Sequence, residues 1–164
     1  MSGPEKKIID ALDRIGTPYE IIEVDPVFSD TTAFCDRYGY PPEQTCNTII
    51  VTSRKGPKNY GACVVLAHTR LDVNKRVRGL LGTAKASFAP AEEVKELTGM
   101  EIGGVTPLAL PAGLPLYVDE RVTRAEWVIL GGGSREIKIK IAPVVFIKLS
   151  AEVIPELAFE VAGR

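Results

Sequence analysis

The 164-residue sequence predicts one α+β domain in which a mixed and mostly antiparallel sheet is flanked by helices. The length fits a single domain, and a hydrophobic content of 45% is sufficient for one core. Helix and strand patterns are mixed along the chain, and several strand patterns follow one another directly, which favours α+β over the regular alternation of an α/β fold. We therefore expect residues 1–164 to form a single domain.

The first 40 residues predict a helix, a strand and a second helix. Apolar residues recur at helical spacing over residues 4–16, which predicts an amphipathic first helix. Residues 19–24 are rich in apolar β-formers and are followed by an Asp-Pro pair, so a strand is expected there. Ser29 or Asp30 can cap a second helix that runs to Tyr38.

The next segment predicts a hairpin and a third helix. Residues 45–52 and 60–67 are two strand patterns joined by the turn-forming sequence at 55–59. Asp72 can then accept an amide hydrogen bond at the start of a helix, and Gly82 can end that helix.

The remaining chain predicts four strands and two helices. Residues 136–141 alternate well, so we expect the three isoleucines of this strand to be buried and Lys138 and Lys140 to face solvent. Residues 142–149 fit either a strand or a helical turn. The other expected elements are strands at 86–89, 116–119 and 126–130, a short helix at 90–98 and a closing helix at 151–162 with Pro155 in its first turn.

Charge and apolar content restrict the possible partners and location. The net charge of −1 excludes a strongly basic nucleic-acid-binding protein, so an RNA partner would be met by a local patch. The segment 70–85 contains such a patch, with Lys75, Arg76 and Arg78 off the apolar stripe of its helix, and a solvated helix face is the alternative. No apolar run is long enough to span a membrane and no signal peptide is evident, so a cytoplasmic protein is expected.

The few cysteines and the single histidine restrict the possible chemistry. Cys35, Cys46 and Cys63 form no Cys-x-x-Cys pair and suit reduced thiols. His68 is the only histidine, so we expect neither a metal site nor a cofactor, and a general base of the Ser-His-Asp type would have to be His68.

A glycine-rich loop follows the predicted helix at 90–98. Gly103 and Gly104 lack a Cβ, so their amides can come close to another molecule, while Pro107 fixes the direction in which the chain leaves the loop. The loop can therefore present N–H groups to a ligand, with a plain surface turn as the alternative.

Several stretches resemble the YbaK family, which includes the editing domain inserted in bacterial prolyl-tRNA synthetases. The most specific is Gly103-Gly104-Val105-Thr106-Pro107-Leu108 after Thr98-Gly99. Thr48-Ile49-Ile50-Val51, Leu71-Asp72-Val73-Asn74-Lys75, Tyr117-Val118-Asp119 and the glycines 132 and 133 support it. The resemblance implies a barrel-like sheet with flanking helices.

The resemblance also implies a trans-acting deacylase that hydrolyses the ester of a mischarged tRNA, with a small amino acid on a proline tRNA as one candidate. The expected partners are mischarged tRNA, bound transiently, and a prolyl-tRNA synthetase, and the protein is expected to be a monomer or homodimer. An aminoacyl ester is already activated, so oriented water and backbone amides that stabilise an oxyanion are sufficient for hydrolysis.

One residue departs from the family pattern. The lysine that usually precedes the strand threonine is replaced by Asn47, which can form hydrogen bonds but has no charge. Asn47 could orient the substrate, the site could be a catalytically silent binding module for an aminoacyl group or a tRNA end, or Lys75 or Arg135 could reach the site instead. Besides a deacylase and a silent binding module, the chain could be a protein-interaction domain that docks on a synthetase.

The candidate site residues form three groups. The catalytic candidates are Asn47, Gly103, Gly104 and Thr106. The candidates for substrate binding are Thr48, Val105, Pro107, Asp119, Gly132 and Gly133. The candidates for tRNA binding are Lys75, Arg76 and Arg78, and no metal ligand is expected.

Overall fold

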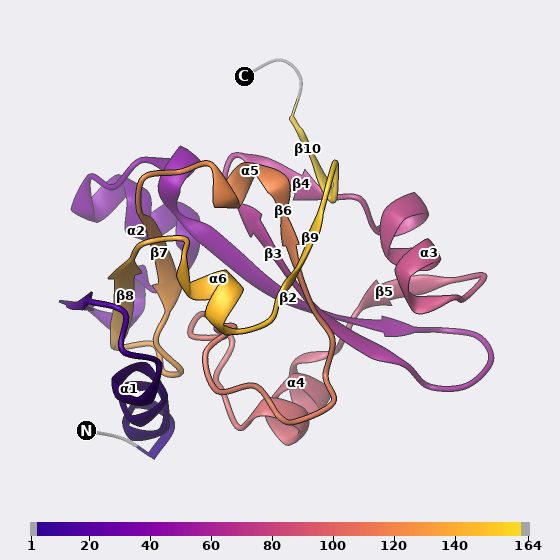
Figure 1. The fold of residues 1–164 in the computed structure, drawn as a ribbon, viewed down its shortest axis with the longest axis horizontal. Coiled ribbons are helices and arrows are strands. Elements are labelled where there is room, and N and C mark those ends of the chain that lie inside the picture. Colours follow the sequence, from indigo (N-terminus) through magenta and orange to yellow (C-terminus); the bar gives the residue numbers. More distant parts are fainter. Residues whose placement is uncertain (1–2, 162–164) are drawn as a thin grey trace.

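The computed structural model describes residues 3–161 and shows a mixed α+β fold (Figure 1). Its α-helices are α1 (Gly3–Ile15), α2 (Thr31–Tyr38), α3 (Arg78–Leu81), α4 (Ala91–Thr98), α5 (Glu120–Thr123) and α6 (Val145–Lys148). Its strands are β1 (Tyr19–Glu23), β2 (Cys46–Ser53), β3 (Tyr60–Leu66), β4 (Thr69–Leu71), β5 (Ala86–Phe88), β6 (Leu116–Asp119), β7 (Val128–Gly131), β8 (Ile137–Ile141), β9 (Glu152–Ile154) and β10 (Ala158–Glu160). Short 3-10 turns lie at Pro26–Phe28 and Pro42–Gln44, and a π-helical turn at Val73–Val77 precedes α3.

The described strands form three sheets. The largest has the order β5-β2-β3-β6-β9, in which β3–β6 and β6–β9 pair in parallel and the other neighbours are antiparallel. A second sheet, β1-β8-β7, and the pair β10-β4 are antiparallel. The expected barrel-like closure is wrong for residues 3–161, because the two larger sheets are separate and are joined there by an isolated bridge between Thr45 and Ile129.

Most of the expected local signals are confirmed. The predicted hairpin forms, with Asn47 opposite Val65. The Asp30 carboxylate accepts the Thr32 amide at the start of α2. Gly82 and Gly99 end their helices in the left-handed conformation. No helix among residues 3–161 has both the length and the apolar content needed to cross a membrane.

The closing helix expected at 151–162 is wrong. This segment instead forms β9, which pairs with β6, and β10, which pairs with β4. Pro155 lies between the two strands, and Glu156 beside it has a positive φ of 55° that no regular helix allows. The open edges of β6 and β4 supply hydrogen-bond partners that sequence periodicity could not reveal. Ala162 lies outside the described residues, and the ambiguous segment 142–149 contains α6.

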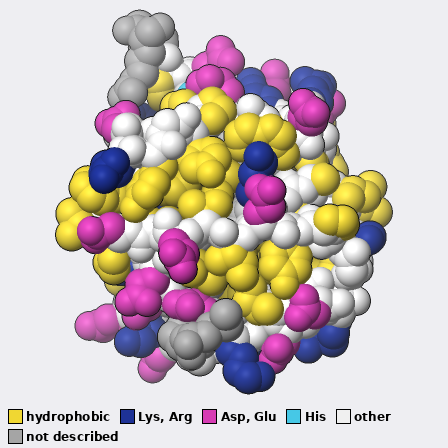
Figure 2. Space-filling view, turned by 90° about the vertical axis from the view of Figure 1, so that its left-hand side faces the viewer, with side chains coloured by type: hydrophobic (Ala, Val, Ile, Leu, Met, Phe, Trp, Pro, Cys, Tyr) yellow, Lys and Arg dark blue, Asp and Glu magenta, His cyan; other side chains and the backbone are white. Residues whose placement is uncertain are grey.

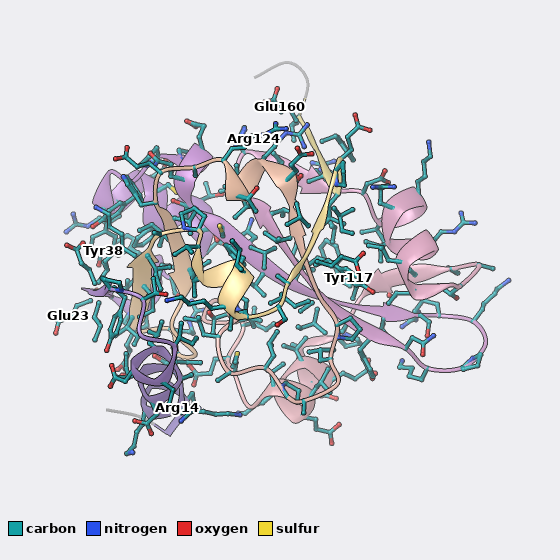
Figure 3. The ribbon with its side chains drawn as sticks, viewed as in Figure 1. Arg14, Glu23, Tyr38, Tyr117, Arg124 and Glu160 are labelled. Carbon is teal, nitrogen blue, oxygen red and sulfur yellow. The ribbon has the colours of Figure 1, made fainter. Side chains whose placement is uncertain are left out.

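Helix α2 covers the β1-β8-β7 sheet on the face of β8 that the sequence predicts to be exposed to solvent. Its Phe34 packs in one apolar cluster with Val24 and Ile129. The Tyr38 hydroxyl accepts the Asp25 amide at 2.9 Å, which ties α2 to the chain after β1, and Figure 3 shows Tyr38 and Glu23 at the same edge of the molecule. The second face of β8 is therefore covered at Lys138 but not at Lys140.

The covered face changes the environment of one lysine. Lys138 is only 5% exposed, so its expected solvent orientation is wrong, whereas Lys140 is partly exposed over the Trp127 ring. The three isoleucines of β8 are buried as predicted.

Candidate active site

A cavity of about 420 Å³ lies where β2, the start of α2, the glycine loop after α4 and the β7–β8 connection meet. The structure brings four of the predicted site residues together in its lining: Asn47, Thr48, Gly103 and Val105. Its other lining residues are Asp30, Thr31, Cys46, Ile49, Ile50, Phe88, Ala89, Val94, Ile102, Gly131, Arg135 and Lys138.

One wall of the cavity is built from two glycine loops packed backbone to backbone. The Gly133 amide donates to the Gly104 carbonyl at 2.7 Å, and the Glu101 amide donates to the Gly133 carbonyl at 3.2 Å. A Cβ on Gly104 would lie 2.2 Å from the Ser134 carbonyl oxygen, and one on Gly131 would lie 2.3 Å from the Val105 carbonyl oxygen. These glycines are needed for the close approach of the two loops.

The amides of the first loop differ in their availability. The Gly104 amide donates to the Glu101 carbonyl at 2.8 Å, so the prediction that it is free to hold a substrate carbonyl is wrong. No hydrogen-bond acceptor is found within residues 3–161 for the amides of Gly103 and Val105. The Ile102 carbonyl, in the same peptide as the Gly103 amide, accepts from Arg135, and the Gly104 carbonyl, in the same peptide as the Val105 amide, accepts from Gly133. In a trans peptide the N–H points the opposite way from the carbonyl. Both amides are therefore directed away from these partners.

The facing wall is strand β2. The Thr31 hydroxyl donates to the Asn47 side-chain carbonyl, which leaves the Asn47 amide group as a donor. The Thr48 hydroxyl oxygen is buried and has no hydrogen-bond partner in the described part of the chain. The Asn47 amide group can therefore donate to a ligand in the cavity, whereas the Thr48 hydroxyl is buried.

Lys138 is a cavity residue that sequence reasoning missed. Its ammonium lies 3.4 Å from the Gly103 carbonyl oxygen and 5.1 Å from the centre of the Phe34 ring. Burial lowers the pKa of Lys138 to about 8; Cys35 and Asp30 oppose this shift and Arg135 adds to it. The alternation of β8 gives Lys138 and Lys140 the same pattern, so no local signal could have distinguished them.

Arg135 holds the glycine loop in place. Its guanidinium donates to the carbonyls of Ile102 and Pro26, both at 2.9 Å, and its own amide donates to the Glu101 carboxylate at 3.2 Å. Of the two cations suggested as substitutes for the family lysine, Arg135 lines the cavity. Lys75 instead lines a separate hollow beside α3.

The other predicted substrate contacts have different environments. The Thr106 hydroxyl is buried and accepts the Leu108 amide at 3.4 Å, as in a local turn. The Asp119 carboxylate is fully buried, caps α5 and pairs with Arg121 at 3.2 Å. The cavity lining does not include six of the predicted site residues: Gly104, Thr106, Pro107, Asp119, Gly132 and Gly133.

The three predicted tRNA-binding residues do not share one environment. Lys75 and Arg78 line the hollow beside α3, whereas the Arg76 guanidinium donates to the Pro155 carbonyl at 2.5 Å. Figure 1 shows α3 at the opposite end of the large sheet from β7 and β8. On the face shown in Figure 2, acidic and basic side chains are interspersed around a largely hydrophobic middle, so that face has no continuous basic surface.

The cysteines and the histidine do not form a reactive centre. No group of three or more histidine, cysteine or acidic residues within residues 3–161 is placed to hold a metal ion. Burial strongly raises the pKa of Cys46, the cysteine in the cavity lining, which disfavours a thiolate nucleophile. His68 lies 3.6 Å from Glu160 and is not a lining residue.

Several known proteins resemble this chain in sequence or in fold. A solved structure described as "a putative trans-editing enzyme for prolyl tRNA synthetase" is 26% identical, has a TM-score of 0.81 and covers 98% of this chain and 99% of its own. YwhH of Bacillus subtilis, whose function is uncharacterised, is 39% identical over 70 residues, 43% of this chain and 44% of YwhH.

A second relative and a family model extend the comparison. The "Putative Cys-tRNA(Pro)/Cys-tRNA(Cys) deacylase EbsC" of Enterococcus faecalis is 24% identical over 102 residues, 62% of this chain and 60% of EbsC. The chain thus matches less than two thirds of the length of YwhH and of EbsC. The sequence model of the aminoacyl-tRNA editing domain matches residues 25–149, which include all the residues that line the cavity. The chain therefore belongs to the aminoacyl-tRNA editing domain family.

Proposed function

We propose that this protein is a trans-acting aminoacyl-tRNA deacylase, which hydrolyses the ester between a wrong amino acid and the end of a tRNA. One observation carries the proposal: within this editing domain, a single cavity contains two available backbone amides on one wall and Asn47 and Thr48 on the other. This arrangement suits a carbonyl group that must be held while it is attacked.

The chemistry requires little more than positioning. Attack on the ester carbonyl moves charge onto its oxygen, and the amides of Gly103 and Val105 can donate to that oxygen. Each such donor typically contributes about 100-fold or more to the rate. The Asn47 amide can orient the attacking water or a ribose hydroxyl.

A small amino acid on a proline tRNA is the proposed substrate. EbsC is described as a deacylase of Cys-tRNA(Pro) and Cys-tRNA(Cys), and the similar structure as a trans-editing enzyme for prolyl-tRNA synthetase. A cavity of about 420 Å³ suits a terminal nucleoside with a small aminoacyl group. We propose that the protein acts in the cytoplasm, as a monomer or homodimer, and meets a prolyl-tRNA synthetase through their shared tRNA.

A panel of mischarged tRNAs tests this function. We expect the full-length protein to release amino acid from at least one small-residue ester on tRNA(Pro) faster than buffer does, and to leave Pro-tRNA(Pro) intact. The measurement is loss of labelled aminoacyl-tRNA with time. A catalytically silent module that binds an aminoacyl group is the second candidate, because Asn47 has no charge. Binding without turnover across the panel would favour that candidate.

The basic residues beside α3 provide a second test. Helix α3 lies at the other end of the large sheet from β7 and β8, so an aminoacyl-nucleoside in the cavity would not reach it. The acceptor arm of a tRNA is long enough to contact both. The double change Lys75→Glu and Arg78→Glu should raise KM about tenfold or more and flatten its salt dependence, since two phosphate contacts are lost.

The control for this test makes the same charge change on α1, by Lys6→Glu and Arg14→Glu. Arg14 is labelled in Figure 3 and lies on α1, at the lower left. Equal effects of the two double variants on KM would show that net charge, and not the patch beside α3, determines affinity.

A further inference from the structure

The cavity contains a buried positive charge that no residue neutralises directly. Lys138 is 5% exposed and forms none of the ion pairs found among residues 3–161. The titratable groups that act on it are Asp30 at the start of α2, Cys35 within α2, and Arg135 just before β8. An ammonium in such a place is unfavourable unless an anionic or strongly polar partner comes close.

The position of Lys138 indicates which part of a ligand it would meet. Its ammonium lies 3.4 Å from the Gly103 carbonyl oxygen, on the loop whose amides of Gly103 and Val105 are available. Because Gly103, Val105 and Lys138 line the same cavity, a carbonyl held by those amides can be reached by the ammonium. The ribose and phosphates of a tRNA end would occupy the mouth of the cavity, because Lys138 is nearly inaccessible from outside.

The opposite wall, strand β2, has the neutral Asn47 at the position where the family usually has a lysine. Asn47 accepts a hydrogen bond from Thr31 and offers only neutral N–H groups to the cavity. A charge-assisted hydrogen bond is roughly twice as strong as a neutral one. A cation on β8 can compensate for a neutral side chain on β2, because both strands line the same cavity.

We propose that Lys138 is a catalytic residue of the deacylation proposed above, and that its ammonium donates to the ester carbonyl oxygen as this oxygen becomes an oxyanion. Water adds to the carbonyl carbon, and the π electron pair moves onto the oxygen beside Lys138. Collapse re-forms the carbonyl and breaks the bond to the ribose oxygen. The proton lost by the water reaches that leaving oxygen through solvent, and Lys138 remains protonated.

The pH dependence of the wild-type enzyme follows from this role. Burial lowers the pKa of Lys138 to about 8, so the active, protonated form is lost as pH rises through that value. We expect kcat to fall above about pH 8, although uncatalysed ester hydrolysis becomes faster with pH. If kcat instead rises in parallel with the uncatalysed rate up to about pH 9.5, well above this pKa, the proposal is overturned without any variant.

The variant test compares two lysines of the same strand. Lys138→Met should lower kcat about 100-fold, leave KM within about twofold and abolish the decline above pH 8. Lys140→Met is the matched control, because Lys140 lies over Trp127 and does not line the cavity. Thermal unfolding of each variant checks that it is folded. An unchanged kcat in folded Lys138→Met, or an effect confined to KM, would refute the proposal.

A charge rescue separates catalysis from packing. We expect Asn47→Lys combined with Lys138→Met to recover about tenfold in kcat over Lys138→Met alone, since the cation returns to the same cavity from β2. A purely structural Lys138 would give no such recovery. Absence of wild-type turnover on the whole panel would refute the deacylase function itself, whereas an active wild type with an equally active Lys138→Met refutes only the role of Lys138.

Discussion

Replacement of Gly104 by alanine is expected to lower the free energy of unfolding by about 3 kcal/mol or more and to abolish deacylation. The new Cβ would lie 2.2 Å from the Ser134 carbonyl oxygen and 2.8 Å from the Ser134 amide nitrogen. Both are backbone atoms, so the contact can be relieved only if the two glycine loops separate. Their separation would displace the amides of Gly103 and Val105. Urea denaturation and turnover on the mischarged tRNA measure the two effects.

Gly79→Ala is the matched control for this change. A Cβ on Gly79 would meet no atom within 4 Å, and the residue lies in α3. We expect Gly79→Ala to leave kcat unchanged at saturating tRNA, because the residue is outside the cavity, and to increase the free energy of unfolding by up to about 1 kcal/mol. If Gly104→Ala were as stable and active as Gly79→Ala, the two loops would not be in the close contact described above.

Replacement of Lys138 by methionine is expected to increase the free energy of unfolding at pH 7 by up to about 3 kcal/mol. The pKa of Lys138 falls from its usual 10.5 to about 8 in the folded protein. Between these values the unfolded chain binds more protons, so the wild type gains stability as pH rises. Below about pH 8 the full cost of burying the charge is present, and above about 10.5 it disappears, because the lysine is then neutral in both states.

The measurement is urea denaturation of wild type and Lys138→Met at pH 7 and near pH 10.5. The difference should be largest at pH 7 and should shrink towards zero at the higher pH. Lys140→Met, which removes a partly exposed lysine, should show little of this dependence. A Lys138→Met protein that is less stable than wild type at pH 7 would mean that the contacts of Lys138 with Phe34 and Gly103 outweigh its desolvation. A stability gain together with lost turnover is the usual trade-off at an active site.

Local sequence signals predicted much of the fold. The Asp30 cap, the end of α4 at Gly99 and the β2–β3 hairpin all depend on residues close together in the chain, and each is found as expected. The family motif likewise indicated that Asn47 and the glycine loop share one site, and the cavity contains both. Such features can be read from sequence because the interactions that form them are local or follow a repeated motif.

Long-range contacts account for the errors. Segment 151–162 forms two strands because the edges of β6 and β4 are open beside it. Gly104 is a packing glycine because the Ser134 backbone lies against it. In both cases the deciding partner is at least 30 residues away in the chain, and no local pattern contains that information.

The sequence by itself determined the α+β class, most element boundaries and the family to which the chain belongs. Only the tertiary structure decided which residues face the cavity. Lys138 and Lys140 occupy equivalent positions in the alternation of β8, and the packing of Phe34 in α2 buries one of them. Burial and charge depend on what covers a residue, and that cover comes from segments that are distant in the chain.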